Sequence, residues 1–499
     1  MSRKSAPNLR PLGRAALVVV GCGPTGVAGL VQAALEGIPA IGIEAGPAPL
    51  ASILGYMEGL LLTSPAAYYE VGALPLDCAA CNRLTREEVL HYYARVISHH
   101  GLDIRCGTRC IGLEPIGRHV LVRVTTSEGL GWFRADRVLV TSWYEKRPLD
   151  PDLLSSDHKI AVHYTVQNPI LFAGKKVVVL GGGLSAYEYA TRLMENGQTV
   201  VLLARCAARP IFQDPRFRRL VAATGSAVFH RISGFVLGRS RVRFTHKGAK
   251  CTVHCDALVA AIGQRLREEV LQILSGARVL SRRECRLLRQ ARSYERLIQE
   301  FPNEDEAALM QRAAAELPDL KQQLFQGRRG VHLAGGALHA GSSNGGVVYS
   351  LFSATLAVRT IAGHPLPEAT QASLPEYLSA LPLPEKIPQR LAFARISDLR
   401  PQRASVRTSR PALSDAEEGQ AGQSLWQEDP SCCGPPEILR ERPEIEMVVR
   451  DADGTRSVGN LARRLGMRTG IEQAALFSLL RHLWWTGGLT WLPAGGRQS

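Results

Sequence analysis

The chain has 499 residues, of which 45% are hydrophobic and 21% charged, so we expect about two to four globular domains rather than one core. It contains no apolar run of the roughly 18 residues that a membrane span requires, and its short basic start leads directly into a glycine motif. We therefore expect neither a membrane span nor a secretory leader, and we place the protein in the cytoplasm. The formal net charge of +15 indicates a basic surface, or attraction to phosphorylated ligands, nucleic acid or an acidic partner.

Strand and helix patterns alternate from residue 15 to residue 265. Short apolar runs such as LVVV, AIGIE, KKVVVL and TVVLLA are typical of strands. Amphipathic stretches such as VAGLVQAALEG and TREEVLHYYARVISHHG lie between several of them and indicate helices. This alternation predicts an α/β fold with parallel sheets and helices on their faces.

The first chemical motif is a glycine cluster that follows the apolar run LVVV. In it, Gly21 permits a tight turn, Gly23 lets the backbone approach a pyrophosphate, and Gly26 lets a helix pack closely on the strand. Glu44 ends the next predicted strand, where an acidic side chain can accept hydrogen bonds from a ribose. A glycine-rich turn that binds nothing is the alternative. The predicted dinucleotide-binding residues here are Gly21, Gly23, Pro24, Thr25, Gly26 and Glu44.

A second glycine cluster follows KKVVVL and again precedes a helical pattern. Its predicted binding residues are Gly181, Gly183, Ser185 and Ala186. The next strand, TVVLLA, leads to Arg205 instead of an acid. A guanidinium pairs with a 2′-phosphate that a carboxylate would repel, so Arg205 favours NADPH over NADH. The alternative is a solvated arginine at the end of a strand.

Two dinucleotide sites in one chain are typical of an electron relay, in which NADPH supplies a hydride and a flavin passes the electrons on. The first site is predicted to hold FAD and the second NADPH. The predicted domains are an FAD-binding domain at 1–165 and 330–365 and, inserted into it, an NAD(P)H-binding domain at 166–264. We thus expect two Rossmann-like domains, one inside the other.

The remaining segments have different compositions. Residues 265–329 are rich in Arg, Leu, Glu and Gln and predict a helical insert, which could be a lid over the NADPH cleft, a partner surface or a solvated helix. Residues 366–437 are rich in Pro, Ser and Arg, as in a partly disordered linker. Residues 438–499 combine two helical patterns with a hairpin-like end, which predicts a small winged-helix-like module that could recruit a protein partner.

These motifs, together with stretches such as SILGYMEGLLLTSPAAYYEVGALPL, VHYTVQNPILFAG, DALVAAIG and GVHLAGG, resemble a known superfamily. It is that of the FAD/NAD(P)-dependent pyridine nucleotide oxidoreductases. The similarity is to its thioredoxin-reductase-like members, especially the bacillithiol disulfide reductase group, and also to flavin monooxygenases. The resemblance implies FAD, NADPH and oxidoreductase activity, often in a homodimer.

Three positions depart from this family pattern. The inserted domain has no Cys-x-x-Cys; its nearest approach is Cys251 and Cys255, with three residues between them. The last glycine motif, around Gly335, lacks the Asp that usually holds the flavin, although Gly335 remains a predicted binding residue. Thr25 stands where the bacillithiol group has a cysteine in the first loop, and Cys22 lies elsewhere in that loop.

The chain has 11 cysteines, an odd number, and structural disulfides are not expected without an export signal. Cys78 and Cys81 form its single Cys-x-x-Cys, a spacing that can give a reactive thiolate and a reversible disulfide. They are the candidate catalytic residues; a zinc half-site or ordinary small residues near a turn are the alternatives, and no metal site is predicted.

The sequence as a whole predicts an FAD-dependent oxidoreductase that takes hydride from NADPH and passes electrons to an unidentified disulfide or small molecule. One alternative is a flavin monooxygenase acting on a heteroatom or a natural product. Another is a degenerate flavoprotein that serves as a binding or regulatory module.

Overall fold

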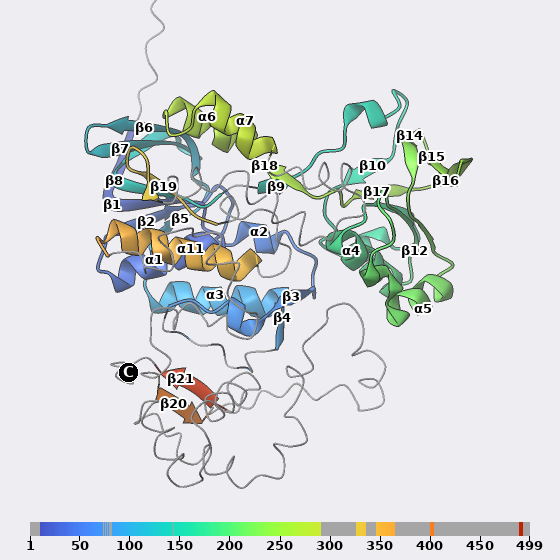
Figure 1. The fold of residues 1–499 in the computed structure, drawn as a ribbon, viewed down its shortest axis with the longest axis horizontal. Helices are drawn as coiled ribbons and strands as arrows, with labels where there is room; N and C mark the ends of the chain where they lie inside the picture. Colours follow the sequence, from blue (N-terminus) through green and yellow to red (C-terminus); the bar gives the residue numbers. More distant parts are fainter. Residues whose placement is uncertain are drawn as a thin grey trace, which may run out of the picture.

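The protein is described by a computed structural model. It describes residues 10–72, 74, 76, 78, 82–142, 144–290, 326–335, 346–364, 400–403 and 489–492. Two lobes, each built around its own sheet, are joined by the short strands β9 (Tyr144–Lys146) and β18 (Gln264–Leu266) (Figure 1). None of the described helices has the length and apolar character needed to cross a bilayer.

The first lobe contains a seven-stranded sheet in the order β5-β2-β1-β8-β7-β6, with β19 pairing beside β8. Strands β1, β2, β5, β8 and β19 run parallel, and β6, β7 and β8 form an antiparallel meander. The strands are β1 (Arg10–Val20), β2 (Ala40–Ile43), β5 (Ile104–Arg105), β6 (Arg109–Ile116), β7 (His119–Thr126), β8 (Gly129–Val140) and β19 (Val331–Leu333).

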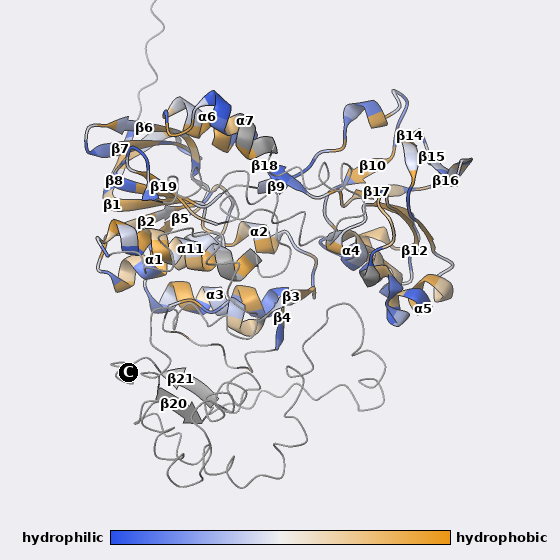
Figure 2. Cartoon of the chain, in the orientation of Figure 1, coloured by the Kyte–Doolittle hydropathy of each residue, from blue (hydrophilic) through white to orange (hydrophobic). Residues whose placement is uncertain are grey.

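Helices cover both faces of this sheet, because its central strands are apolar on both sides. In β1, Leu17 and Val19 pack toward α1, α3 and α11, whereas Val18 packs toward α6 and α7. Figure 2 shows the strands and α11 as mostly hydrophobic and α6 with a hydrophilic outer side. The helices are α1 (Pro24–Leu35), α2 (Ala51–Leu54), α3 (Arg86–His99), α6 (Glu268–Gly276), α7 (Arg282–Gln290) and α11 (Gly346–Ile361).

Local sequence explains where these helices begin. Thr85 caps α3 in a reciprocal arrangement with Glu88, so the TREE segment starts a helix as its spacing predicts. Pro24 occupies the first helical position of α1, where its missing N–H costs no hydrogen bond. A short antiparallel pair, β3 (Leu61–Pro65) and β4 (Arg83–Thr85), precedes α3.

The second lobe has a five-stranded parallel sheet in the order β10-β17-β11-β12-β13 and a three-stranded meander, β14-β15-β16. β10 pairs with β17 and therefore belongs to this sheet. The second lobe thus begins before residue 166, the predicted start of the inserted domain. The elements are β10 (Ala161–His163), β11 (Lys176–Leu180), α4 (Leu184–Glu195), β12 (Thr199–Leu203), α5 (Pro215–Ala223), β13 (Ala227–Phe229), β14 (Ser233–Leu237), β15 (Arg241–His246), β16 (Ala249–His254) and β17 (Ala257–Ala260).

The described part of the predicted helical insert belongs to the first lobe. Leu271 and Leu274 of α6 and Leu288 of α7 are buried against Val122 and other residues of the sheet. These two helices are therefore a layer of that lobe's core. The rest of the predicted insert, residues 291–325, lies outside the described residues.

The predicted linker and C-terminal module also lie largely outside the described residues. Only β20 (Arg400–Arg403) and β21 (Leu489–Leu492) are described there, and they pair antiparallel with each other. The sequence predicted a hairpin within the end of the chain, but the described partner of β21 is β20, from the predicted linker.

Candidate functional site

The first glycine loop sits at the carboxyl end of β1, and two of its glycines are required by the fold. Gly21 has φ +93°, and its N–H donates to the Ile43 carbonyl oxygen at 2.8 Å. A side chain at Gly21 would come within 2.7 Å of Ser142, and one at Gly26 would strike the carbonyl oxygen of Gly21. The turn and the close packing of helix on strand thus need glycine even without a ligand.

Gly23 differs, because the fold leaves room at this position. Among the described residues, a Cβ there would meet only the Ser52 hydroxyl, at an ordinary 3.5 Å. Gly23 is also the N-cap of α1, and no side chain caps the backbone N–H groups that begin this helix. An uncapped helix start with open space in front of it fits the pyrophosphate of a dinucleotide.

Glu44 lies directly beside this loop. Its Oε2 accepts a hydrogen bond from the Cys22 N–H at 2.9 Å, and its Oε1 accepts one from the Gly46 N–H at 2.8 Å. Burial and the negative charge of Glu44 raise the pKa of Cys22 well above its usual value. Cys22 therefore remains a buried, protonated thiol, and Glu44 holds the loop backbone through both carboxylate oxygens; its contact with a ribose stays a prediction.

Gly335 reaches the same loop from a distant part of the chain. It follows β19, has φ +88° and donates from its N–H to the Ser353 hydroxyl at 2.9 Å. A Cβ at Gly335 would lie 3.1 Å from Thr25, so these two predicted residues are neighbours. The parallel pairing of β19 with β8 brings Gly335 to this edge.

The second glycine loop has the same division of roles. Gly181 has φ +154° and donates to the Leu203 carbonyl oxygen at 2.9 Å, and a side chain on it would strike the Ala261 carbonyl. Ala186 is fully buried against this turn. Gly183 is the N-cap of α4 without a side-chain cap, and among the described residues no atom lies within 4 Å of where its Cβ would stand.

The charged and polar residues predicted for this second site lie at the same edge. Arg205 is exposed just beyond the carboxyl end of β12, and Ser185 is exposed in the first turn of α4. Arg205 is thus beside the glycine loop, as its predicted contact with a 2′-phosphate requires. That contact stays a prediction.

A two-stranded ribbon joins the two glycine-loop edges. β8 ends at Val140 and leads to β9, and β17 ends at Ala260 and leads to β18. β9 pairs antiparallel with β18, from Tyr144 opposite Leu266 to Lys146 opposite Gln264. Each strand has three residues, so the ribbon itself is about 10 Å long, and a few further residues connect it to each sheet.

The loop after α2 provides a second contact between the lobes. Met57 is 2% exposed and packs in the core cluster of the second lobe with Tyr189 and Leu193 of α4. The Glu58 N–H donates to the Gln167 carbonyl oxygen at 2.8 Å. These contacts fix how α4 faces the first lobe.

Charged groups from both lobes interact at this contact. Burial raises the pKa of Glu188, on α4, to about 7, although the positive charges of Arg83 and Lys146 oppose the shift. Burial also lowers the pKa of Lys146 in the ribbon. This cluster of charged groups was not predicted from the sequence. Its one local signal is Glu188, which stands between Tyr187 and Tyr189 on α4.

The predicted catalytic cysteines are only partly placed. Cys78 is half-buried and packs against the core of the first lobe. Cys81 lies outside the described residues, so the role of the pair stays a prediction.

Comparison with known proteins bears on the two glycine loops. Residues 18–225, which contain both of them, match the pyridine nucleotide-disulphide oxidoreductase family. The match covers less than half of the chain, and over this segment the chain is similar to that family. The predicted superfamily is thus confirmed, and the match implies the predicted cofactors, FAD and NADPH.

Curated relatives are similar over shorter stretches. A ferredoxin–NADP reductase of Ignicoccus hospitalis is 36% identical over 109 residues, which cover 20% of this chain and 35% of that protein. One of Ralstonia nicotianae is 30% identical over 195 residues, or 38% of this chain and 50% of that protein. The chain therefore spans half or less of the length of these two relatives.

Two solved structures share the fold at low sequence identity. A bacillithiol disulfide reductase of Bacillus cereus aligns with a TM-score of 0.53 at 17% identity, covering 70% of this chain and 99% of its own. A flavin monooxygenase variant of Stenotrophomonas maltophilia aligns with a TM-score of 0.51 at 16% identity and the same coverage. At these identities the similarity shows a common α/β architecture and carries no information about the substrate.

Proposed function

We propose that the protein is an NADPH-dependent flavoprotein oxidoreductase that passes electrons through FAD to a disulfide or a small molecule. The observation that carries the proposal is the short ribbon of β9 and β18, which follows β8 of the first sheet and β17 of the second and so connects the edges that carry the two glycine loops. A relay needs both dinucleotides within reach of one another, and this connection supports that arrangement. When bound, NADPH supplies a hydride and FAD accepts it and gives up its electrons.

The residues of the chain would act by binding and orientation. Gly23 and the start of α1 would hold the FAD pyrophosphate, and Glu44 its ribose. Gly183 and the start of α4 would hold the NADPH pyrophosphate, with Arg205 at the 2′-phosphate. Fixing both ligands in one geometry is the main contribution a protein makes to hydride transfer between them.

The acceptor is the open part of the proposal. Reduction of a disulfide consumes two electrons and two protons and yields two thiols, and a redox cysteine pair would relay them. In the inserted domain, burial raises the pKa of Cys255 to about 12, and Cys251 donates to the Ala249 carbonyl. With its pKa raised this far, Cys255 lacks the character of a reactive thiolate, which favours a route that does not use it.

This observation supports a flavin monooxygenase acting on a heteroatom or a natural product as the second candidate. Ferredoxin, named for the curated relatives, is a third type of acceptor, and the net charge of +15 would favour a protein partner of negative charge. The proposed domain division, a homodimer and a partner for the C-terminal module remain predictions.

The decisive experiment is an anaerobic titration of the purified protein with NADPH, followed through the flavin absorbance. We expect one equivalent of NADPH to bleach one flavin. Admitting oxygen with a candidate substrate, or adding a disulfide or a ferredoxin, then identifies the acceptor by oxygen uptake, by new thiols or by ferredoxin reduction. A colourless protein that binds neither added FAD nor NADPH would refute the proposal and leave a regulatory module.

A further inference from the structure

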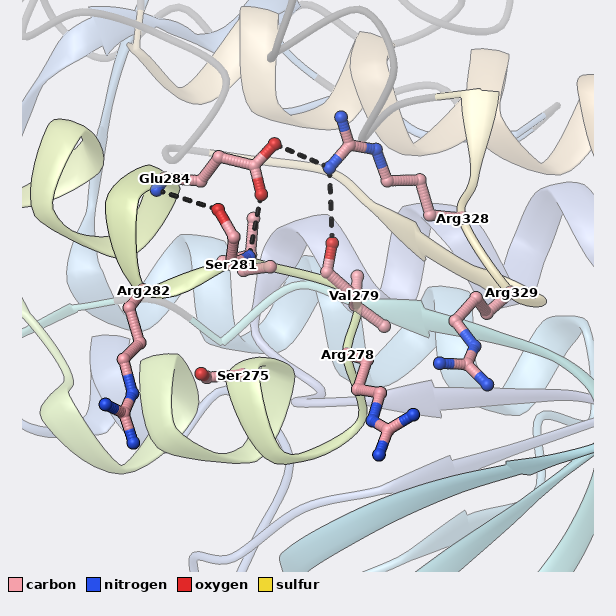
Figure 3. A pocket seen from close by; sticks show the side chains of 9 residues that line it. Ser275, Arg278, Val279, Ser281, Arg282, Glu284, Arg328 and Arg329 are labelled. Carbon is pink, nitrogen blue, oxygen red and sulfur yellow. Dashed lines mark hydrogen bonds and ion pairs between the residues drawn. The ribbon is translucent and has the colours of Figure 1, made fainter.

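The first lobe has a hollow of about 740 Å³ that lies apart from both glycine loops. It is formed by the turn between α6 and α7 and by the turn before β19 (Figure 3). It borders the amino end of β19, whereas Gly335 of the FAD loop follows the carboxyl end of this strand. Its charged residues are Arg278, Arg282, Arg328, Arg329 and Glu284, which give the lining a formal net charge of +3.

One of the four arginines has a structural role. Arg328 donates to the Glu284 carboxylate at 2.8 Å, and its NH1 lies 3.4 Å from the Val279 carbonyl oxygen. Glu284 also accepts from the Ser281 N–H at 2.7 Å, which caps α7. The one acidic group of the hollow is therefore already engaged in holding the two turns together.

The other three arginines are not engaged in this way. Arg278, Arg282 and Arg329 are exposed, and within the described parts of the chain no carboxylate pairs with any of them. In Figure 3 the three side chains extend away from the pair formed by Arg328 and Glu284, with Arg282 at one end of the hollow and Arg278 and Arg329 at the other. Arg278 and Arg329 thus place two like charges at the same end of the hollow, which is unfavourable without a counter-charge.

Two of these arginines also occupy backbone positions that suit glycine. Arg278 follows the C-cap of α6 with φ +54°, where a left-handed residue ends the helix. Arg329 has φ +56° in a tight turn closed by hydrogen bonds of 2.9 and 3.0 Å between Arg328 and Val331. A side chain with a Cβ costs stability at both positions relative to glycine, so the fold gains nothing from arginine there.

We propose that this hollow binds a small anion that carries several negative charges on phosphate groups. The planar guanidinium groups of Arg278 and Arg329 match phosphate oxygens in geometry and charge. The volume is in the range of small-molecule sites. The site is separate from the NADPH and FAD loops and does not depend on the proposed function.

The test is calorimetric titration of inorganic pyrophosphate into the purified protein, with NADP⁺ present to occupy the nicotinamide site. Three variants each remove one positive charge: Arg278→Gly, Arg329→Gly and the control Arg283→Ala. Arg283 is exposed on α7 and does not line the hollow. We expect saturable binding to the unmodified protein, about fivefold to tenfold weaker binding in each glycine variant, and less than a twofold change in the control.

Thermal unfolding of the same variants separates binding from folding. Both glycine variants should unfold at an equal or higher temperature, because glycine removes the left-handed strain. The proposal is overturned by absent saturable binding, by glycine variants that bind as well as the unmodified protein, or by variants that unfold earlier. Equal weakening in Arg283→Ala would also overturn it, since affinity would then follow the overall surface charge, as with an acidic macromolecule.

Discussion

Replacing Glu188 by Gln is expected to stabilise the protein at high pH. Burial raises the pKa of this carboxyl from 4.5 to about 7, and the nearby Arg83 and Lys146 offset only part of the shift. Since the folded pKa is the higher one, the folded state favours the protonated acid. The stability it contributes is complete below pH 4.5 and is lost as the pH rises through 7.

The size of the effect follows from the shift. A difference of about 2.5 pKa units corresponds to about 3 kcal/mol once the folded carboxyl is ionised. Glutamine has nearly the same size and cannot ionise. The variant should therefore exceed the unmodified protein in stability by about 3 kcal/mol at pH 8 and by only about 1 kcal/mol at pH 5.

Urea unfolding at the two pH values, followed by circular dichroism, measures this difference. Glu195→Gln is the matched control, because Glu195 lies on the same helix but pairs at the surface with Arg192 and Arg216. Its replacement should cost less than about 1 kcal/mol, and equally at both pH values. If Glu188→Gln changed stability by the same amount at pH 5 and pH 8, the assigned burial and pKa of Glu188 would be wrong.

Two further predictions concern the glycine loops and the NADPH preference. Gly26→Ala should prevent stable folding of the first lobe, because its Cβ would strike the Gly21 carbonyl, and a thermal unfolding scan would show this. Gly183→Ala should leave the unfolding temperature unchanged but weaken NADPH binding at least about tenfold, as measured by titration. Arg205→Glu should raise the KM for NADPH about tenfold or more and that for NADH far less, and equal changes in the two KM values would contradict the assigned role.

The parts of the molecule that the sequence predicts correctly are those set by neighbouring residues. A strand, a glycine turn and a helix follow each other within 20 residues at each loop, and the TREE segment caps α3. In these cases hydrogen bonds and steric limits act within one or two turns of chain. The order of residues is then enough to place Gly21, Gly26 and Gly181.

Features that depend on distant segments could not be predicted in this way. Gly335 meets Thr25 only because β19 returns beside β8. Glu188 meets Arg83 and Lys146 only because the loop around Met57 docks on α4. At Arg278 the chain takes the left-handed conformation that glycine usually takes at a helix end, and the arginine gives no local sign of it.

The glycine motifs combine two requirements that the sequence cannot separate and the structure can. Gly21, Gly26 and Gly181 are needed to close turns and to pack helices, and they would be needed in a fold that binds nothing. Gly183 meets no described neighbour and caps its helix without a side chain, so the fold has no use for a missing Cβ there. Without a Cβ at Gly183, free space lies in front of the N–H groups that begin α4. This edge of the sheet is connected by the ribbon of β9 and β18 to the edge of the first sheet, which carries the other glycine loop. Because a merely structural glycine would be packed, Gly183 is the stronger argument for a bound dinucleotide.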